Sequence, residues 1–320
     1  MVQIMKKTDK MWAYLIHIGY NMWLPKDTNV RLLGNGYAED YCTASDTLRF
    51  DKDVWDLVTG NMPEAGINTL VIDLGEGIQY DSHPEIAVEG SLSKNELSDM
   101  LSDLREKGIT PIPKLNFSTC HDEWLGVHSQ YISTDKYYEV CKNLIEEVIE
   151  LFDNPPFFHL GMDEETYGHQ TKHKIAVIRN SQLWWHDLFF FAKAVTDAGV
   201  RPWVWSDRIW NHEDEFLKNM PKEFLQSNWY YDASFLREQT YVGAYNLLDE
   251  NGYEHVPTGS NWGAQWNFEG TVNYCYETCN QDQIKGFLMS VWRPTLRDLK
   301  YRHLEAVDIV RKVRNDLISK

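Results

Sequence analysis

Eight short apolar runs alternate with amphipathic stretches along the 320 residues of the chain. The runs are rich in β-branched and aromatic residues, which favours strands over residues 12–18, 68–74, 109–116, 156–162, 201–206, 224–230, 255–260 and 286–292. Eight strand–helix alternations in a chain of this length are the signature of a (β/α)8 TIM barrel. The sequence therefore predicts an α/β fold in which residues 1–320 form one barrel domain, with no separate second domain.

The helices between these runs carry start and stop signals. Ser93 and Glu96 have the spacing of a capping box, and Gly108 is placed to end a helix over residues 93–107. Apolar residues at helical spacing predict further helices over residues 135–152, 181–198 and 298–318. A doubly wound open sheet is the competing fold, but no GxGxxG follows the first strand. The long non-periodic stretch over residues 19–50 predicts a βα loop on the active face.

The charge of the chain limits its partners. Lys and Arg number 31 against 48 Asp and Glu, which gives a net charge of −17. This acidity argues against nucleic acid or an anionic membrane surface as a partner, because both require clustered cations. No apolar run reaches the roughly 18 residues that cross a bilayer. The oligomeric state is left open.

Five cysteines show no CxxC spacing, which favours a reduced compartment. Lys6, Lys7 and Lys10 precede the first apolar run, but that run is short, contains His17 and has no A-x-A pattern, so it predicts a strand rather than a signal peptide. As written, the chain predicts a cytoplasmic protein. A leader already removed would make it secreted or periplasmic.

Aromatic residues are in excess, with 13 Trp, 17 Tyr and 13 Phe. The Trp content is roughly three times the usual level. Flat rings with one polar group pack well against sugar rings. Most of these residues are expected in the core, so the excess favours a carbohydrate partner without establishing it.

Active sites of TIM barrels lie at the carboxyl ends of the strands. The predicted strand ends carry acids, amides and aromatic residues, which are the components of a glycoside hydrolase. They are His17, Asn21, Asp73, Glu76, Asn116, His121, Asp163, Glu164, Glu165, Asp207, Trp229, Tyr230, Tyr231, Asn261, Trp262, Trp292 and Arg293.

The strongest motif runs from an apolar strand straight into three consecutive carboxylates at residues 163–165. Neighbouring buried acids raise one another's pKa, which suits a general acid, although acids also commonly begin helices. The segment His159-Leu-Gly-Met-Asp-Glu164 resembles the H-x-G-G-D-E motif of glycoside hydrolase family 20, the β-N-acetylhexosaminidases. Further likeness follows in chain order over residues 68–76 and 84–85, 112–121, 203–207 and 286–292.

The resemblance implies a retaining, substrate-assisted mechanism in which the substrate's own 2-acetamido oxygen attacks the anomeric carbon. Glu164 would be the acid and then the base, and Asp163 would orient the acetamide. Tyr230 or Tyr231 would bind the acetamide carbonyl. No cofactor and no metal is implied. The remaining substrate-binding candidates, with the expected sugar walls among them, are Asp73, Glu76, Asn116, His121, His159, Trp205, Asp207, Trp229, Trp262, Trp266, Trp292 and Arg293.

Several positions depart from the family pattern. Met162 replaces the second glycine of the motif, and Asp73 and Glu76 stand where the family has His and Asp. Lys114 and Asn116 stand where it has acids. Arg293 stands near the family's Glu for sugar hydroxyls, and the family's N-terminal domain has no counterpart here.

These departures keep other hypotheses open. Asp207 or Asp73 would serve as the second carboxylate of a two-acid glycosidase on a sugar without an N-acetyl group, or the barrel binds carbohydrate without catalysis. His169 and His173 have the spacing of metal ligands on one helix face, but no third ligand follows at helical spacing, so no metal is predicted.

Overall fold

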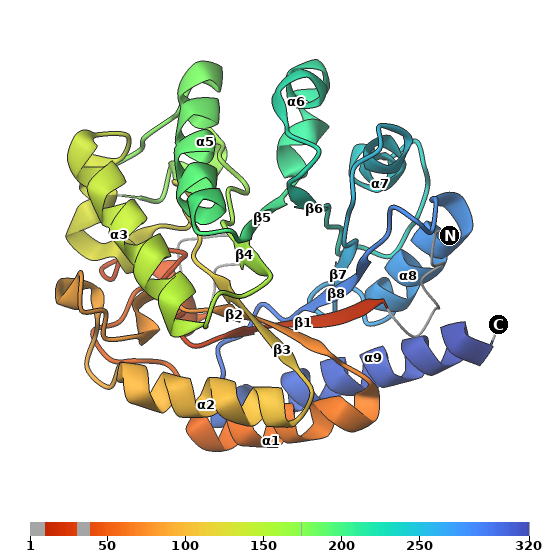
Figure 1. Ribbon diagram of the computed structural model, residues 1–320, viewed down its shortest axis with the longest axis horizontal. Coiled ribbons are helices and arrows are strands. Elements are labelled where there is room, and N and C mark those ends of the chain that lie inside the picture. Colours follow the sequence, from red (N-terminus) through yellow and green to blue (C-terminus); the bar gives the residue numbers. More distant parts are fainter. Residues whose placement is uncertain (1–9, 31–38, 174, 320) are drawn as a thin grey trace.

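The computed structural model describes residues 10–30, 39–173 and 175–319 of the chain (Figure 1). Its strands form one parallel sheet in the order β6-β5-β4-β3-β2-β1-β8-β7. They are β1 (Met11–His17), β2 (Thr69–Asp73), β3 (Thr110–Lys114), β4 (Phe157–His159), β5 (Arg201–Trp205), β6 (Leu225–Ser227), β7 (Thr258–Ser260) and β8 (Gly286–Ser290).

The two outer strands of this order also meet, which closes the sheet. The amide of Val256 donates to the carbonyl of Gln226 at 2.8 Å, and the amide of Thr258 donates to Asn228 at 2.9 Å. The predicted (β/α)8 barrel is therefore confirmed. Every residue of β2 and β8 is buried, because side chains fill the barrel and helices cover its outside.

Helices surround the strands (Figure 1). They are α1 (Lys52–Ala65), α2 (Lys94–Glu106), α3 (Asp135–Leu151), α4 (Tyr167–Gln170), α5 (Ser181–Asp197), α6 (Glu213–Asn219), α7 (Thr240–Glu250), α8 (Asn267–Thr278) and α9 (Lys300–Ser319). The predicted capping box is present at α2: the Glu96 amide donates to the Ser93 hydroxyl, and the Ser93 amide donates to the Glu96 carboxylate. No helix in the described part of the chain has the length and apolarity that a bilayer crossing requires.

Short 3-10 helices occupy the connections: η3 (Asp40–Cys42), η4 (Gly75–Gly77), η5 (Pro84–Ile86), η6 (Glu123–Tyr131), η7 (Asp207–Trp210) and η8 (Arg297–Leu299). Most of them follow strand ends, so they lie where the connections to the next helix begin. The predicted loop over residues 19–50 is described except for residues 31–38, and Lys6 and Lys7 also lie outside the described residues.

A polar layer closes the barrel interior just below its mouth. His17, Asp73, Lys114 and His159 end four adjacent strands and pair in register. The Lys114 ammonium bonds the Asp73 carboxylate, and His17 Nδ1 lies 3.4 Å from Asp73 Oδ2. Burial would raise the pKa of Asp73, but the charge of Lys114 and the hydrogen bond from His17 outweigh it and lower that pKa. The layer thus holds a compensated charge pair inside the protein.

Candidate active site

The connection after β4 turns sharply, and this turn positions the acids. The strand ends at His159, and Gly161, Met162 and Glu164 then have left-handed backbones with φ of 72°, 75° and 57°. A Cβ atom at Gly161 would overlap the Asn116 side chain, so glycine is required there. Neighbouring residues of a regular strand point to opposite faces, so two adjacent acids can serve one ligand only where the strand has ended. The turn meets that condition.

Asp163 and Glu164 each place a carboxylate oxygen within 4.8 Å of the other, with His121 beside both. His121 Nε2 lies 3.2 Å from Glu164 Oε2 and 3.5 Å from Asp163 Oδ2. Asn116 Nδ2 donates to Asp163 Oδ1 at 2.8 Å. The connections after β3 and β4 therefore bring four of the predicted residues together.

His121 and Glu164 shift each other's pKa in opposite directions. Burial would raise the pKa of Glu164, but the hydrogen bond and charge of His121, with the charge of His169, lower it. Burial would lower the pKa of His121, but the charge of Asp163 and the contact with Glu164 raise it. Both shifts favour an ion pair of protonated His121 and ionised Glu164.

Asp207 lies directly behind this pair, at the start of η7. Its Oδ2 accepts a hydrogen bond from the Glu164 amide at 2.9 Å, while its Oδ1 is buried without a hydrogen-bond partner among the described residues. Burial and the charge of Asp163 raise the pKa of Asp207 to about 8. Near neutral pH, Asp207 is therefore mainly a neutral carboxylic acid.

The third consecutive acid, Glu165, has a separate environment. It bonds the guanidinium of the buried Arg179, which also contacts Asp187 Oδ2 at 2.9 Å and the Phe117 carbonyl at 3.0 Å. This network anchors the segment after the turn. The three adjacent acids thus have different neighbours: His121 lies beside Asp163 and Glu164, and Arg179 binds Glu165.

Several aromatic side chains, called the wall below, lie at or just after the ends of β5, β6 and β8. Trp205 and Trp292 lie 6.1 Å apart between ring centroids, and both are buried. Trp229 stacks on Tyr231 at 5.1 Å, and Tyr231 Oη lies 3.1 Å from Ser290 Oγ. Burial raises the pKa of Tyr231, so its hydroxyl stays protonated and can donate.

Tyr230, between Trp229 and Tyr231 in the sequence, has a different aromatic neighbour. It packs edge-on against Phe235, with ring centroids 5.3 Å apart. Of the two tyrosines predicted for the acetamide, Tyr231 is the one near the acids, since Asp163 and Glu164 act on its pKa.

Three other predicted residues have partners of their own below the mouth. Asp73 is paired with Lys114, and His159 Nδ1 accepts the Gly161 amide at 3.1 Å inside the barrel. Glu76 Oε1 accepts the amides of Tyr20 and Asn21 at 2.8 and 3.1 Å. All three side chains are buried and hydrogen-bonded to other parts of the chain.

The rim carries the remaining predicted residues. Trp262 and Trp266 follow β7 and are 42% and 60% exposed. The guanidinium of Arg293 donates to the Trp292 carbonyl at 2.7 Å, which places it beside the wall. Asn261 is buried, and its Nδ2 donates to Glu305 Oε2 at 2.9 Å.

Sequence reasoning did not single out Trp23, although the predicted loop over residues 19–50 contains it. Its ring lies edge-on to His121 at 4.8 Å and to Trp292 at 5.7 Å between centroids. The only sequence signal was an aromatic residue in a loop expected over the site. His169 and His173 diverge, since they contact Glu164 and Glu123 at 3.5 and 3.4 Å.

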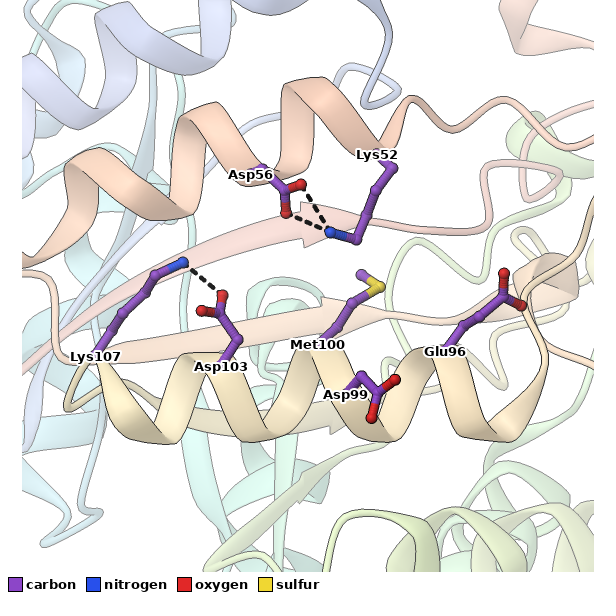
Figure 2. Close-up of a pocket in the computed structure, with 7 residues that line it drawn as sticks. All are labelled: Lys52, Asp56, Glu96, Asp99, Met100, Asp103 and Lys107. Atoms are coloured by element: carbon purple, nitrogen blue, oxygen red, sulfur yellow. Dashed lines mark hydrogen bonds and ion pairs between the residues drawn. The ribbon is translucent and has the colours of Figure 1, made fainter.

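A groove between α1 and α2 lies on the outside of the barrel (Figure 2). Its two lysines are paired with its own acids, Lys52 with Asp56 at 2.6 Å and Lys107 with Asp103. The residues that line it include no aromatic side chain among those described. The acids and aromatic residues described above therefore remain the candidate site.

No known protein-family model matches the sequence. The structure is similar to that of a GH20 exo-β-N-acetylglucosaminidase from Vibrio harveyi, with a TM-score of 0.62 and 16% identity over 94% of this chain and 54% of that one. A β-N-acetylhexosaminidase from Bacteroides fragilis matches with a TM-score of 0.64 and 13% identity, over 95% of this chain and 65% of that one. Dispersin B matches with a TM-score of 0.58 and 14% identity, over 83% of this chain and 96% of that one.

The chain therefore spans between half and two thirds of the length of the Vibrio and Bacteroides proteins. The proteins compared share the barrel with this chain. The predicted likeness to family 20 is confirmed at the level of the fold.

Proposed function

We propose that this protein is a divergent relative of the family 20 glycoside hydrolases that removes a β-linked N-acetylhexosamine from the end of a glycan. One observation carries the proposal: the Asp163 and Glu164 carboxylates lie together on a left-handed turn at the barrel mouth, with His121 beside both. The barrel shared with hexosaminidases and the motif at residues 159–164 support the same activity.

In the proposed mechanism, the substrate's 2-acetamido oxygen attacks the anomeric carbon and displaces the leaving oxygen, which takes a proton from Glu164. An oxazolinium ion results. Asp163 orients the acetamide N–H and stabilises its growing positive charge, and Tyr231 donates to the acetamide oxygen. Glu164 then removes a proton from the water that opens the ion, so the configuration at the anomeric carbon is retained.

The proton for the first step comes from the pair of His121 and Glu164. In the free protein the raised pKa of His121 favours this residue as its holder, 3.2 Å from Glu164 Oε2. A bound sugar excludes water from Glu164 and strengthens the effect of its burial, which favours the protonated acid. The pH dependence of the reaction therefore belongs to the pair rather than to either residue.

Substrate assistance is favoured over a two-acid mechanism because the other carboxylates are unsuited to nucleophilic attack. Asp207 is neutral near pH 7, and Asp73 is ion-paired inside the barrel. A nucleophile must be ionised and must face the sugar. The acetamide of the substrate is therefore a better nucleophile here than either Asp207 or Asp73.

The test uses aryl β-glycosides of N-acetylglucosamine and N-acetylgalactosamine beside those of glucose and galactose. We expect turnover of the N-acetyl substrates alone, with a retained anomeric configuration by NMR. Glu164→Gln and Asp163→Asn should each lower kcat/KM by about 10²- to 10⁴-fold. Glu146→Gln, an exposed acid on α3 (54% exposed), is the matched control and should leave activity unchanged.

Turnover of sugars without an acetamide would refute substrate assistance and shift the nucleophile to a carboxylate. Sugar binding that survives Glu164→Gln, with no turnover of any glycoside, would instead identify a carbohydrate-binding barrel.

A further inference from the structure

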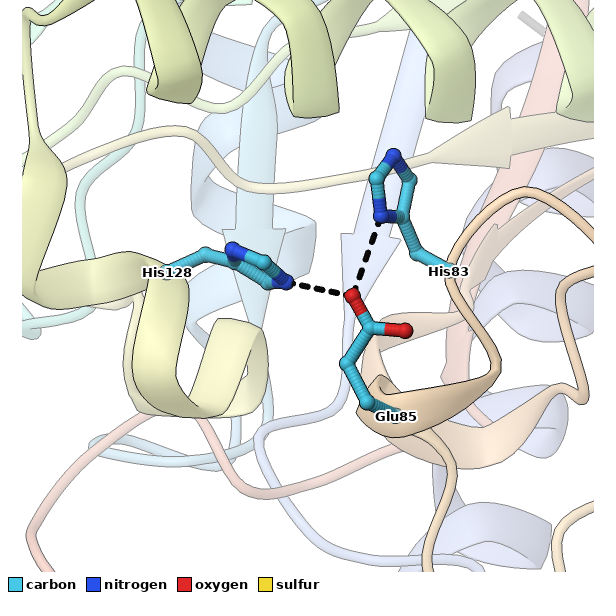
Figure 3. A group of neighbouring side chains, drawn as sticks. All are labelled: His83, Glu85 and His128. Atoms are coloured by element: carbon cyan, nitrogen blue, oxygen red, sulfur yellow. Dashed lines mark hydrogen bonds and ion pairs between the residues drawn. The ribbon is translucent and has the colours of Figure 1, made fainter.

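Two histidines and a glutamate converge on one point at the edge of the barrel mouth, apart from the acid pair (Figure 3). His83 and Glu85 belong to the connection after β2, at η5, and His128 lies in η6 after β3. Glu85 Oε1 is 3.1 Å from His83 Nδ1 and 2.7 Å from His128 Nε2. The three candidate donor atoms all lie within 4.8 Å of one another.

We propose that His83, Glu85 and His128 bind a divalent transition-metal ion of the Zn²⁺ type. Two imidazoles and one carboxylate form a ligand set that suits zinc and similar ions. Zinc–ligand bonds of about 2.0–2.2 Å at tetrahedral angles separate ligand atoms by roughly 3.3–3.6 Å. The observed 2.7 and 3.1 Å therefore need only a small outward rotation of the side chains to admit an ion.

The surroundings fit a partly open site. The Asn143 amide lies 3.3 Å from His83 Nε2, on the far side of the ring, and so holds this imidazole in place. His128 is buried at 5% exposure, whereas the Glu85 side chain is 46% exposed. His128 Nδ1 has no hydrogen-bond partner among the described residues, so His128 is the ring that can adjust. Solvent can supply the remaining coordination position beside Glu85.

The ion would join the connection after β2 to the connection after β3. The connection that carries His128 also carries His121 and Trp124, and the Trp124 indole donates to the Asn116 carbonyl at 2.9 Å. The side chain of Asn116 in turn holds Asp163. The metal would thus be structural: it would fix the segment beside the acids and take no part in bond cleavage.

The first experiment is calorimetric titration of the full-length, chelator-treated protein with ZnCl₂. We expect one ion per chain and a higher midpoint of thermal unfolding when zinc is present. Glu85→Gln and His128→Gln should weaken binding at least tenfold, because each removes a ligand while keeping a polar side chain of similar size. His186→Gln, which alters an exposed histidine on α5, should bind zinc as the wild type does.

The second experiment is Co²⁺ substitution of the wild type, which tests the site even if the variants fail to fold. A visible spectrum of nitrogen and oxygen ligation, without a sulfur-to-cobalt charge-transfer band, is expected. Such a band would overturn the proposal in favour of the cluster of Asp249, His255 and Cys279. Absence of stoichiometric zinc binding, or unchanged binding in folded Glu85→Gln and His128→Gln, would also overturn it. None of these measurements depends on glycosidase activity.

Discussion

Replacing Met162 by alanine and by glycine should invert the usual order of stability of those two residues. Met162 is 2% exposed, so either change removes a buried side chain at a cost of about 2–5 kcal/mol. Its φ of 75° costs an L-residue about 1–2 kcal/mol, which glycine avoids. Glycine loses about 0.5–1 kcal/mol through the greater entropy of its unfolded state.

These values make the Met162→Gly protein more stable than Met162→Ala by about 0.8 kcal/mol, roughly fourfold in the unfolding equilibrium. Both variants remain less stable than the wild type, because the loss of burial exceeds the relief of strain. Glycine, the residue of the family motif, would therefore not stabilise this protein. Methionine here gains more from packing than it loses to its backbone conformation.

The assay is urea unfolding of both variants beside Leu160→Ala and Leu160→Gly. Leu160 is equally buried in the same connection, but its φ is not positive. At that position glycine should be less stable than alanine by about 0.5–1 kcal/mol, the ordinary order. If glycine is also the less stable residue at position 162, the left-handed turn is not what strains Met162, and the reasoning fails.

Three further changes test the charges around the mouth. In His121→Gln the cation that lowers the pKa of Glu164 is absent, so burial should raise the pKa of that carboxyl, measured by NMR titration of the carboxyl carbon; an unmoved pKa would contradict the pairing. Asp73→Asn leaves Lys114 buried without its counter-charge and should lower the free energy of unfolding by about 3–5 kcal/mol at pH 7, measured in urea; a loss below 1 kcal/mol would show that the ammonium finds other partners. The folded-state pKa of Asp207 is raised to about 8, so its proton stabilises the fold fully below the unfolded pKa of about 3.9, and this contribution is lost as pH rises through 8. Asp207→Asn should therefore remove a slope of up to about 1.4 kcal/mol per pH unit across that window, and an unchanged slope would place the proton elsewhere.

The barrel was predictable because its signal is repeated. Eight apolar runs and intervening helical periodicities each support the same architecture, and the capping box at Ser93 and Glu96 was readable from spacing alone. The ends of the strands could not be predicted, since the run over residues 156–162 stays apolar and buried beyond His159. What ends β4 is backbone geometry at Gly161 and Met162, and methionine gives no local sign of a left-handed conformation.

The site was predictable only as far as barrel order allows. Adjacent strands place the connections after β3 and β4 side by side, so the neighbourhood of His121 and the acids followed from the fold. The pairing of Glu165 with Arg179, fourteen residues further on, has no periodic signal. Nor did the sequence distinguish Tyr230 from Tyr231, because that depends on where β6 ends.

Three strands of the barrel are short. β4, β6 and β7 each have three residues, whereas β1, β2, β3, β5 and β8 have five or more. Asp163 and Glu164 follow β4, and Trp229 and Tyr231 follow β6, so these parts of the site depend on strands with few ladder hydrogen bonds. Regions with fewer such bonds open locally at a lower free energy than the whole domain. The protein should consequently lose its capacity to bind sugar in mild denaturant while most of its helical signal persists.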